Sequence, residues 1–99
     1  MYYAIISTDV VNSLELRLEH RPAHIKRIQE LHDQGRVLAA GPHPAVDAED
    51  PGVAGFTGSL LVVKFPNLKA AEEWAAEDPF LKNGIYASSV VKPFKKVLP

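Results

Sequence analysis

The chain has 99 residues, a formal net charge of −1 and no cysteine, which predicts a single domain over residues 1–99 and argues against a disulfide framework or a thiolate metal site. Charges of both signs are interspersed, so no basic face for nucleic acid is expected. No stretch approaches the roughly 20 apolar residues that span a bilayer, and the start lacks a basic leader, so we expect a cytoplasmic protein without a membrane partner.

The first elements expected are a strand and a short helical segment. Residues 2–7 are apolar and rich in β-formers, which is typical of a strand. Asn12 is followed three residues later by Glu15, the spacing of a capping box, so one or two helical turns are predicted over residues 14–19.

Pro22 separates this segment from a longer predicted helix. Proline is unfavourable inside a helix but favourable at its first position, where its missing N–H has no partner to lose. We therefore expect the main helix over residues 22–34, with Gly35 as its left-handed cap. The second strand is predicted over residues 36–42.

A long loop and a buried strand are expected next. Residues 44–57 combine prolines, glycines and acids without apolar periodicity, which predicts a loop. Residues 58–65 are almost wholly apolar and predict a strand buried on both faces. Asn67 is the predicted cap of a second helix, and Asp78-Pro79 ends that helix or begins a short new turn.

The last strand is predicted over residues 86–97, with Pro93 indicating a sheet edge or a bulge. The resulting order, strand–helix–strand–strand–helix–strand, predicts an α+β protein of ferredoxin-like fold. Right-handed crossovers then give a four-stranded antiparallel sheet with both helices on one face. In this topology the start of the first helix and the ends of the second strand and second helix meet at one rim of the sheet.

His24 and Asp78 are the candidate chemical groups at that rim. His24 falls in the first turn of the predicted main helix, where the positive end of the helix favours the neutral imidazole that a general base needs. Asp78 follows the second helix and would fix the tautomer of His24 and stabilise the imidazolium that forms. The alternative is that His24 only borders the core and that Asp78 only caps the turn begun by Pro79.

Other residues near the rim are candidates for binding a substrate. Arg17 is the predicted contact for an anionic group, whereas Arg21 is expected to be a solvated surface arginine. Gly41 and Pro42 turn the chain tightly at the end of the second strand, and Ser59 brings a hydroxyl to the start of the third.

A metal site is not expected. His20 and His24 have the four-residue spacing of helical zinc ligands, but Pro22 lies between them. The glutamate that accompanies such a pair in metalloproteases is also missing.

Six segments carry a resemblance to a known family: residues 17–18 (RL), 21–24 (RPAH), 38–42 (LAAGP), 55–59 (GFTGS), 78–79 (DP) and 91–97 (VKPFKKV). Together they resemble the YciI-like proteins, and the resemblance runs nearly end to end. It implies the ferredoxin-like fold of the dimeric α/β-barrel superfamily and a His–Asp active site carried here by His24 and Asp78. That family includes a dehydrochlorinase acting on a chlorinated hydroxyhydroquinone, and its wider superfamily holds muconolactone isomerases. Phe80 departs from the pattern, which has tyrosine there.

Two hypotheses for function follow. The first is an enzyme without a cofactor, in which His24, oriented by Asp78, is the general acid and base for isomerisation or elimination, such as dehydrochlorination, of a small anionic or aromatic-derived metabolite. The second is a non-catalytic module that binds a small molecule or regulates a partner, because fold does not decide function. The uncovered apolar face of the sheet predicts a homodimer, or a higher oligomer built from it, with residues 93–97 helping to close the pocket.

Overall fold

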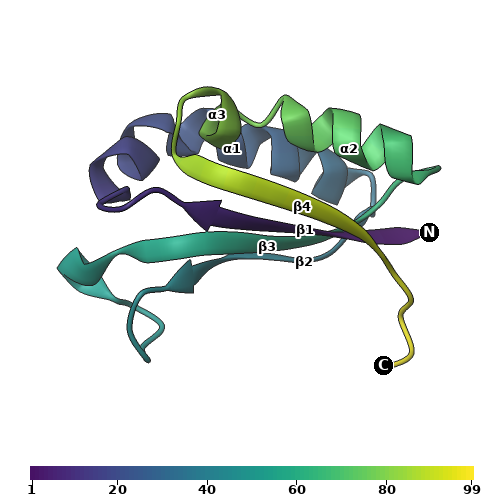
Figure 1. The fold of residues 1–99 in the computed structure, drawn as a ribbon. Coiled ribbons are helices and arrows are strands. Elements are labelled where there is room, and N and C mark those ends of the chain that lie inside the picture. The colour runs from purple at the N-terminus through teal and green to yellow at the C-terminus, as the bar shows by residue number, and fades with distance from the viewer.

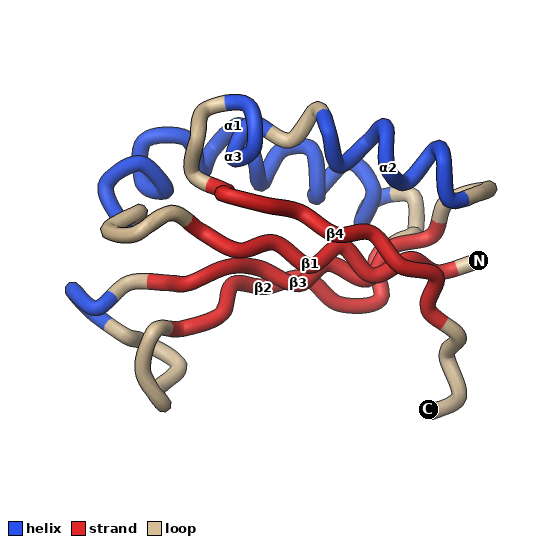
Figure 2. Tube along the Cα trace, viewed as in Figure 1, coloured by secondary structure: helices blue, strands red, loops and turns tan.

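The structure, a computed structural model, describes residues 1–99 as one sheet with its helices on one face (Figures 1 and 2). The strands follow the order β2-β3-β1-β4, and every neighbouring pair is antiparallel. This arrangement confirms the predicted ferredoxin-like fold. The elements are β1 (Tyr2–Asp9), α1 (Leu14–Asp33), β2 (Val37–Pro44), the short 3-10 helix η1 (Gly52–Ala54), β3 (Phe56–Lys64), α2 (Leu68–Ala76), α3 (Pro79–Lys82) and β4 (Tyr86–Phe94).

The core lies between the sheet and the helices because side chains alternate along each strand. Tyr3 and Ile5 of β1 lie opposite Val63 and Leu61 of β3, and all four are buried. Burial of apolar surface at about 25 cal/mol per Å² is the main favourable contribution to folding. The helices complete this core with Ile28, Leu31, Ala71 and Ala75.

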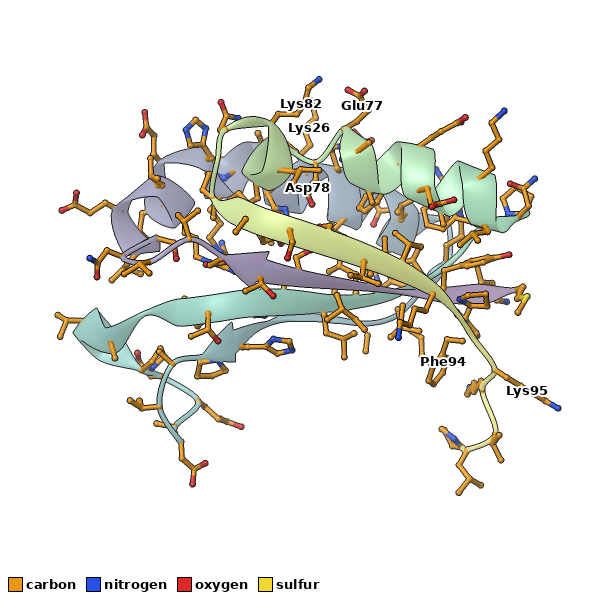
Figure 3. The ribbon with its side chains drawn as sticks, in the orientation of Figure 1. Lys26, Glu77, Asp78, Lys82, Phe94 and Lys95 are labelled. Carbon is orange, nitrogen blue, oxygen red and sulfur yellow. The ribbon has the colours of Figure 1, made fainter.

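The other face of the sheet carries no helix (Figure 1). Ile6, Leu60 and Val90 lie side by side on β1, β3 and β4 and are 39%, 36% and 48% exposed. Phe94 continues this face at the end of β4 (Figure 3). The prediction that the third strand is buried on both faces is therefore wrong at Leu60.

The first helix differs most from its prediction. α1 is one continuous helix of 20 residues with Pro22 inside it. Ser13, not Asn12, occupies the N-cap position, and Asn12 has a positive φ of 57°. The predicted break before Pro22 is wrong because buried side chains on both sides of the proline hold the helix together, and their contacts outweigh one lost backbone hydrogen bond.

Other boundaries were predicted more closely. Asn67 caps α2 by accepting a hydrogen bond from the Ala70 N–H at 2.8 Å. β4 is an edge strand, which is where Pro93 is tolerated. β3 begins two residues earlier than expected, at Phe56, and β4 ends at Phe94 rather than at residue 97. None of the helices is both long enough and apolar enough to cross a bilayer.

Candidate active site

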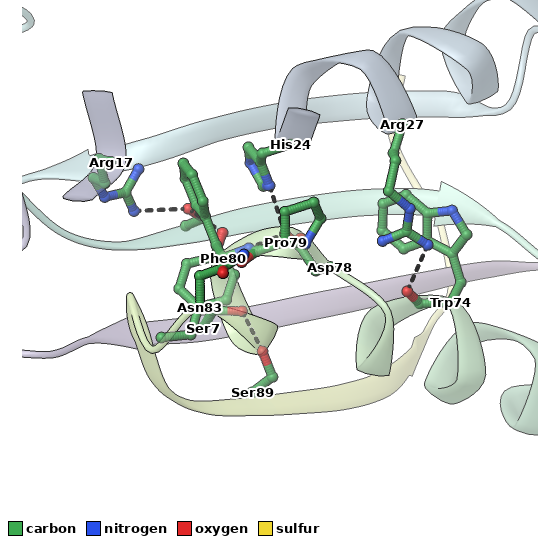
Figure 4. A network of polar contacts seen from close by, with 12 residues as sticks. Ser7, Arg17, His24, Arg27, Trp74, Asp78, Pro79, Phe80, Asn83 and Ser89 are labelled. Atoms are coloured by element: carbon green, nitrogen blue, oxygen red, sulfur yellow. Dashed lines mark hydrogen bonds and ion pairs between the residues drawn. The ribbon is translucent and has the colours of Figure 1, made fainter. Parts of the chain in front are cut away.

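His24 and Asp78 form a buried pair between α1 and the start of α3 (Figure 4). His24 Nδ1 lies 2.8 Å from Asp78 Oδ1, and the two side chains are only 7% and 5% exposed. Asp78 is also the N-cap of α3, and its Oδ1 accepts a hydrogen bond from the Phe80 N–H at 2.9 Å. Asp78 therefore both caps the turn and holds His24, so the two predicted roles are combined in one carboxylate.

The position of His24 within its helix is a correction. His24 lies ten residues beyond Leu14, the first residue of α1. The field of a helix end falls off within the first turn, so the N-terminus of α1 does not act on this imidazole as predicted. Asp78 is the charged group in direct contact with it.

The hydrogen bond to Asp78 leaves the second ring nitrogen of His24 free. A carboxylate accepts, so Nδ1 carries the proton of the neutral ring and Nε2 carries the lone pair. Nε2 makes no hydrogen bond within the chain and keeps contact with solvent. An imidazole held in this way can take a proton at Nε2 while the carboxylate stabilises the resulting charge.

Aromatic rings fix the plane of His24. The ring of Phe80 stacks on the imidazole with centroids 3.9 Å apart and an angle of 5° between the planes. Tyr86 meets the imidazole edge-on, with centroids 6.2 Å apart. This packing leaves the imidazole little freedom to rotate away from Asp78.

A cavity of about 280 Å³ lies beside His24, between α1 and the strands β2 and β3. Its size, slightly below the usual range for drug-sized ligands, suits a single-ring molecule. The structure places Arg17, Gly41, Pro42 and Ser59 in its wall with His24. Gly41 and Pro42 lie within β2 and pair with β3, so the tight turn predicted for them at the end of the second strand is wrong. Arg21, which was expected to be a surface arginine only, lines the cavity too. The remaining lining residues are Leu14, Leu18, Ile25, Ile28, Ala40, Phe56, Leu61 and Phe80.

Arg17 is held by a carboxylate that the sequence analysis missed. Its Nε and Nη2 donate to the two oxygens of Asp9 at 2.6 and 3.0 Å, and the Asp9 side chain is only 1% exposed. Nη2 also donates to the Gly58 carbonyl at 2.9 Å and to Ser59 Oγ at 3.0 Å. Ser13 Oγ donates to Asp9 at 2.6 Å. Arg17 is therefore not a free cation but the centre of a buried network.

Tyr86 is the second residue of the site that the sequence analysis missed. Its hydroxyl donates to Ser59 Oγ at 2.8 Å. Burial raises the pKa of Tyr86 to about 12, so its hydroxyl stays protonated at neutral pH. The available signal was a tyrosine next to an apolar residue at the start of the last strand, which does not distinguish a pocket residue from a core residue.

The chain offers no cluster of three or more His, Asp or Glu side chains that could hold a metal ion. The polar side chains that line the cavity carry an imidazole, two guanidinium groups and a hydroxyl.

Comparison with known proteins identifies the family. The family model of the YCII-related domain matches residues 1–95. The chain belongs to the YCII-related family. Protein YciI of Escherichia coli O6:H1 is 56% identical over 97 residues, which cover 98% of this chain and 99% of that protein. An uncharacterized protein of Haemophilus influenzae is 52% identical over the same length and coverage. The resemblance to YciI-like proteins is thus confirmed.

A solved structure shares the fold of this YCII-related chain at lower identity. It is 5-chloro-2-hydroxyhydroquinone dehydrochlorinase from Burkholderia phenoliruptrix, in complex with 2,5-dihydroxybenzoquinone. The TM-score is 0.83 at 24% sequence identity, with 96% of this chain and 94% of that chain covered. The likeness supports the fold described above.

Proposed function

We propose that this chain is an enzyme without a cofactor, in which His24 is the general acid and base and Asp78 holds it in position. The reaction class is isomerisation or elimination on a small anionic, ring-shaped or enolisable metabolite. The observation that carries the proposal is the buried 2.8 Å contact from His24 Nδ1 to Asp78, which leaves Nε2 free beside a cavity.

The chemistry would begin with proton transfer to His24. Nε2 takes a proton either from a carbon next to a carbonyl, in which case the electron pair of the C–H bond moves onto the carbonyl oxygen, or from a ring hydroxyl, whose oxygen keeps the pair. Asp78 stabilises the imidazolium that forms. Return of the proton to a different substrate atom gives isomerisation. Loss of a leaving group such as chloride with its electron pair gives elimination, and His24 then releases its proton to solvent, so that HCl leaves in total. Both routes balance without an oxidant or a reductant.

The comparisons support a ring-shaped substrate. The dehydrochlorinase of similar fold acts on a chlorinated hydroxyhydroquinone and was solved with a dihydroxybenzoquinone. A relative 29% identical over 75 residues is the derivative of benzaldehyde biosynthesis cluster protein C of Emericella nidulans. The cavity wall here, with eight hydrophobic residues around Arg17, Ser59 and His24, matches a flat apolar ring that carries oxygens.

The test is a reaction screen with matched histidine variants. Purified protein is incubated with 5-chloro-2-hydroxyhydroquinone and with enolisable ring compounds in heavy water, and chloride release and deuterium incorporation are followed. We expect His24→Gln to lower the rate roughly 100- to 10,000-fold, the usual contribution of a general acid or base. The control is His20→Gln, which alters a histidine outside the cavity wall.

Two outcomes would contradict this function. An active wild type matched by His24→Gln would remove His24 from the chemistry. A wild type that binds these compounds and never turns them over or exchanges their protons would favour the non-catalytic binding module.

A further inference from the structure

Both lone pairs of the Ser59 hydroxyl accept hydrogen bonds from other side chains of the protein. A serine hydroxyl offers two lone pairs and one O–H donor. Arg17 Nη2 donates to Ser59 Oγ at 3.0 Å, and the hydroxyl of Tyr86 donates to it at 2.8 Å. Both lone pairs are thus taken, and no group of the chain accepts the Ser59 proton. Because Ser59 lines the cavity, that proton is left for a ligand.

Arg17 shows the same division between a fixed side and a free side. Three of its five N–H bonds, on Nε and Nη2, are directed at Asp9, Gly58 and Ser59. The two on Nη1 meet no acceptor in the chain, although this nitrogen is not sealed from solvent. The rings of Phe56 and Phe80 lie 5.3 and 5.1 Å from the guanidinium carbon and restrict its movement.

We infer that Ser59 and Arg17 form an oxyanion subsite, in which the Ser59 hydroxyl and Arg17 Nη1 donate to one substrate oxygen while Asp9 and Tyr86 hold both donors in place. The inference rests on the proposed function, since it concerns the same cavity. It adds a substrate requirement: the group bound here is a hydrogen-bond acceptor such as an enolate, phenolate or carboxylate oxygen. An uncharged ligand of the same size is bound less tightly, because hydrogen bonds from these donors to an ionised oxygen are stronger than those to a neutral oxygen.

Asp9 and Tyr86 are positioning residues in this subsite. Asp9 makes two hydrogen bonds with Arg17, a geometry that orients the guanidinium as well as neutralising it. Tyr86 reaches Ser59 because β4 is irregular at its start. Asp9 pairs with Tyr86 while Thr8 pairs with Ser88, so the alternation of β4 shifts by one residue there. Without this bulge, Tyr86 would fall on the open face of the sheet.

The subsite gives the proposed chemistry a second half. When His24 takes a proton, negative charge develops on the substrate oxygen, and donors already aimed at that oxygen stabilise it without reorganising. Ser59, Arg17 and His24 all face one cavity, so one ring can meet the donors and the base together.

The test uses 2,5-dihydroxybenzoquinone, whose acidic hydroxyls ionise, as the anionic probe and hydroquinone as a neutral ring of similar size. Affinities are measured by calorimetry on wild type, Ser59→Ala, Tyr86→Phe and the double variant. We expect Ser59→Ala to weaken binding of the anion roughly tenfold to hundredfold, the value of a hydrogen bond to a charged group. Hydroquinone binding should change far less.

The double variant separates positioning from general support. If Tyr86 acts through Ser59, Tyr86→Phe lowers the affinity for the anion when Ser59 is present. In the double variant it causes no loss of affinity beyond that of Ser59→Ala alone. Equal losses in both backgrounds, unchanged anion binding in Ser59→Ala, or no binding of the anion to wild type at millimolar concentration would each overturn the subsite. Circular dichroism confirms that the variants are folded.

Failure of this inference and failure of the proposed function are distinguishable. His24→Gln keeps both donors, so it should retain the preference for the anion over hydroquinone even if turnover is absent. A wild-type protein with that preference but no turnover would support the oxyanion subsite and contradict the proposed enzymatic function.

Discussion

At the scale of single residues, the position of the Asp78 carboxylate is set by its own turn as well as by its contact with His24. Its Oδ1 accepts from the Phe80 backbone, so the turn of α3 sets the position of the carboxylate. Phe80 in turn stacks on His24. The short segment of Asp78 and Phe80 thus orients the imidazole both through its edge and through its face. A water-exposed aspartate on a loop would provide neither constraint.

Tyr86 predicts how stability responds to alkaline pH. Burial raises its pKa from the ordinary 10.0 to about 12. Between these values the unfolded chain releases the proton while the folded chain keeps it, so the free energy of unfolding falls as pH rises. Because one pKa unit corresponds to about 1.4 kcal/mol, ionisation of Tyr86 should lower the free energy of unfolding by about 2 to 3 kcal/mol at pH 12 relative to its value below pH 10.

Urea denaturation from pH 9 to pH 12 measures this effect. Tyr86→Phe should lose about 1 kcal/mol at neutral pH with the hydrogen bond to Ser59, and should then decline less steeply than wild type. The control is Tyr2→Phe, because Tyr2 lies at the start of β1 and Tyr86 lies beside the end of that strand. Parallel curves for wild type and Tyr86→Phe would show that burial of Tyr86 does not resist ionisation.

At the scale of elements, the fold was predictable because turn and cap residues indicate where its helices begin and end. Asn67, Gly35 and Asp78-Pro79 have backbone preferences that act locally, so they located helix ends correctly. Pro22 has an equally strong local preference, but here packing over the whole length of α1 overrides it. The backbone preference of one residue takes no account of packing contacts made by residues elsewhere in the same helix.

The site was predictable only in part for a related reason. The approach of His24 to Asp78 was predicted from the element order, but that argument placed His24 in the first turn of its helix, whereas His24 lies ten residues beyond Leu14 in α1. The approach of Tyr86 to Ser59 depends on a bulge that shifts the alternation of β4 near Thr8 and Asp9, and one sequence does not show where a strand slips by one residue. Asp9, in contrast, continues the buried face of β1 that carries Tyr3, Ile5 and Ser7. What the sequence does not show is that Arg17 reaches it.

Pro22 also gives a prediction at this scale. Replacing it with alanine restores an N–H inside α1 and removes a ring that conflicts with the backbone of the preceding turn. We expect Pro22→Ala to raise the free energy of unfolding by roughly 1 to 3 kcal/mol, measured by urea denaturation. Ala23→Pro is the converse control and should strongly destabilise the same helix. Destabilisation by Pro22→Ala would mean that α1 needs the bend that proline imposes.

At the scale of the whole molecule, the uncovered face of the sheet calls for a partner. Ile6, Leu60 and Val90 form a continuous apolar row across three strands, and Phe94 extends it. A soluble chain does not usually leave such a face open. We propose a second copy of this chain as the occupant, packed sheet to sheet, with the segment after Phe94 available to cross onto the partner (Figure 3).

Light scattering at micromolar concentration tests the assembly. We expect at least twice the 10.9 kDa of one chain. Leu60→Lys places a charge at the centre of the apolar row and should shift the mass to that of a monomer. Val11→Lys changes an equally apolar residue that is 88% exposed and off the sheet, so it should leave the mass unchanged. A wild type with the mass of one chain would reject the dimer.

The most direct test of the central claim is the tautomer of His24, read from its ring nitrogens by NMR of labelled protein. At about pH 9, where an ordinary imidazole is neutral, we predict a protonated Nδ1 and an unprotonated Nε2 in wild type. Asp78→Asn should lose this bias, while His20 stays unchanged in both proteins. A His24 ring protonated at Nε2 in wild type, or one indifferent to Asp78→Asn, would contradict an imidazole held by Asp78 as a base.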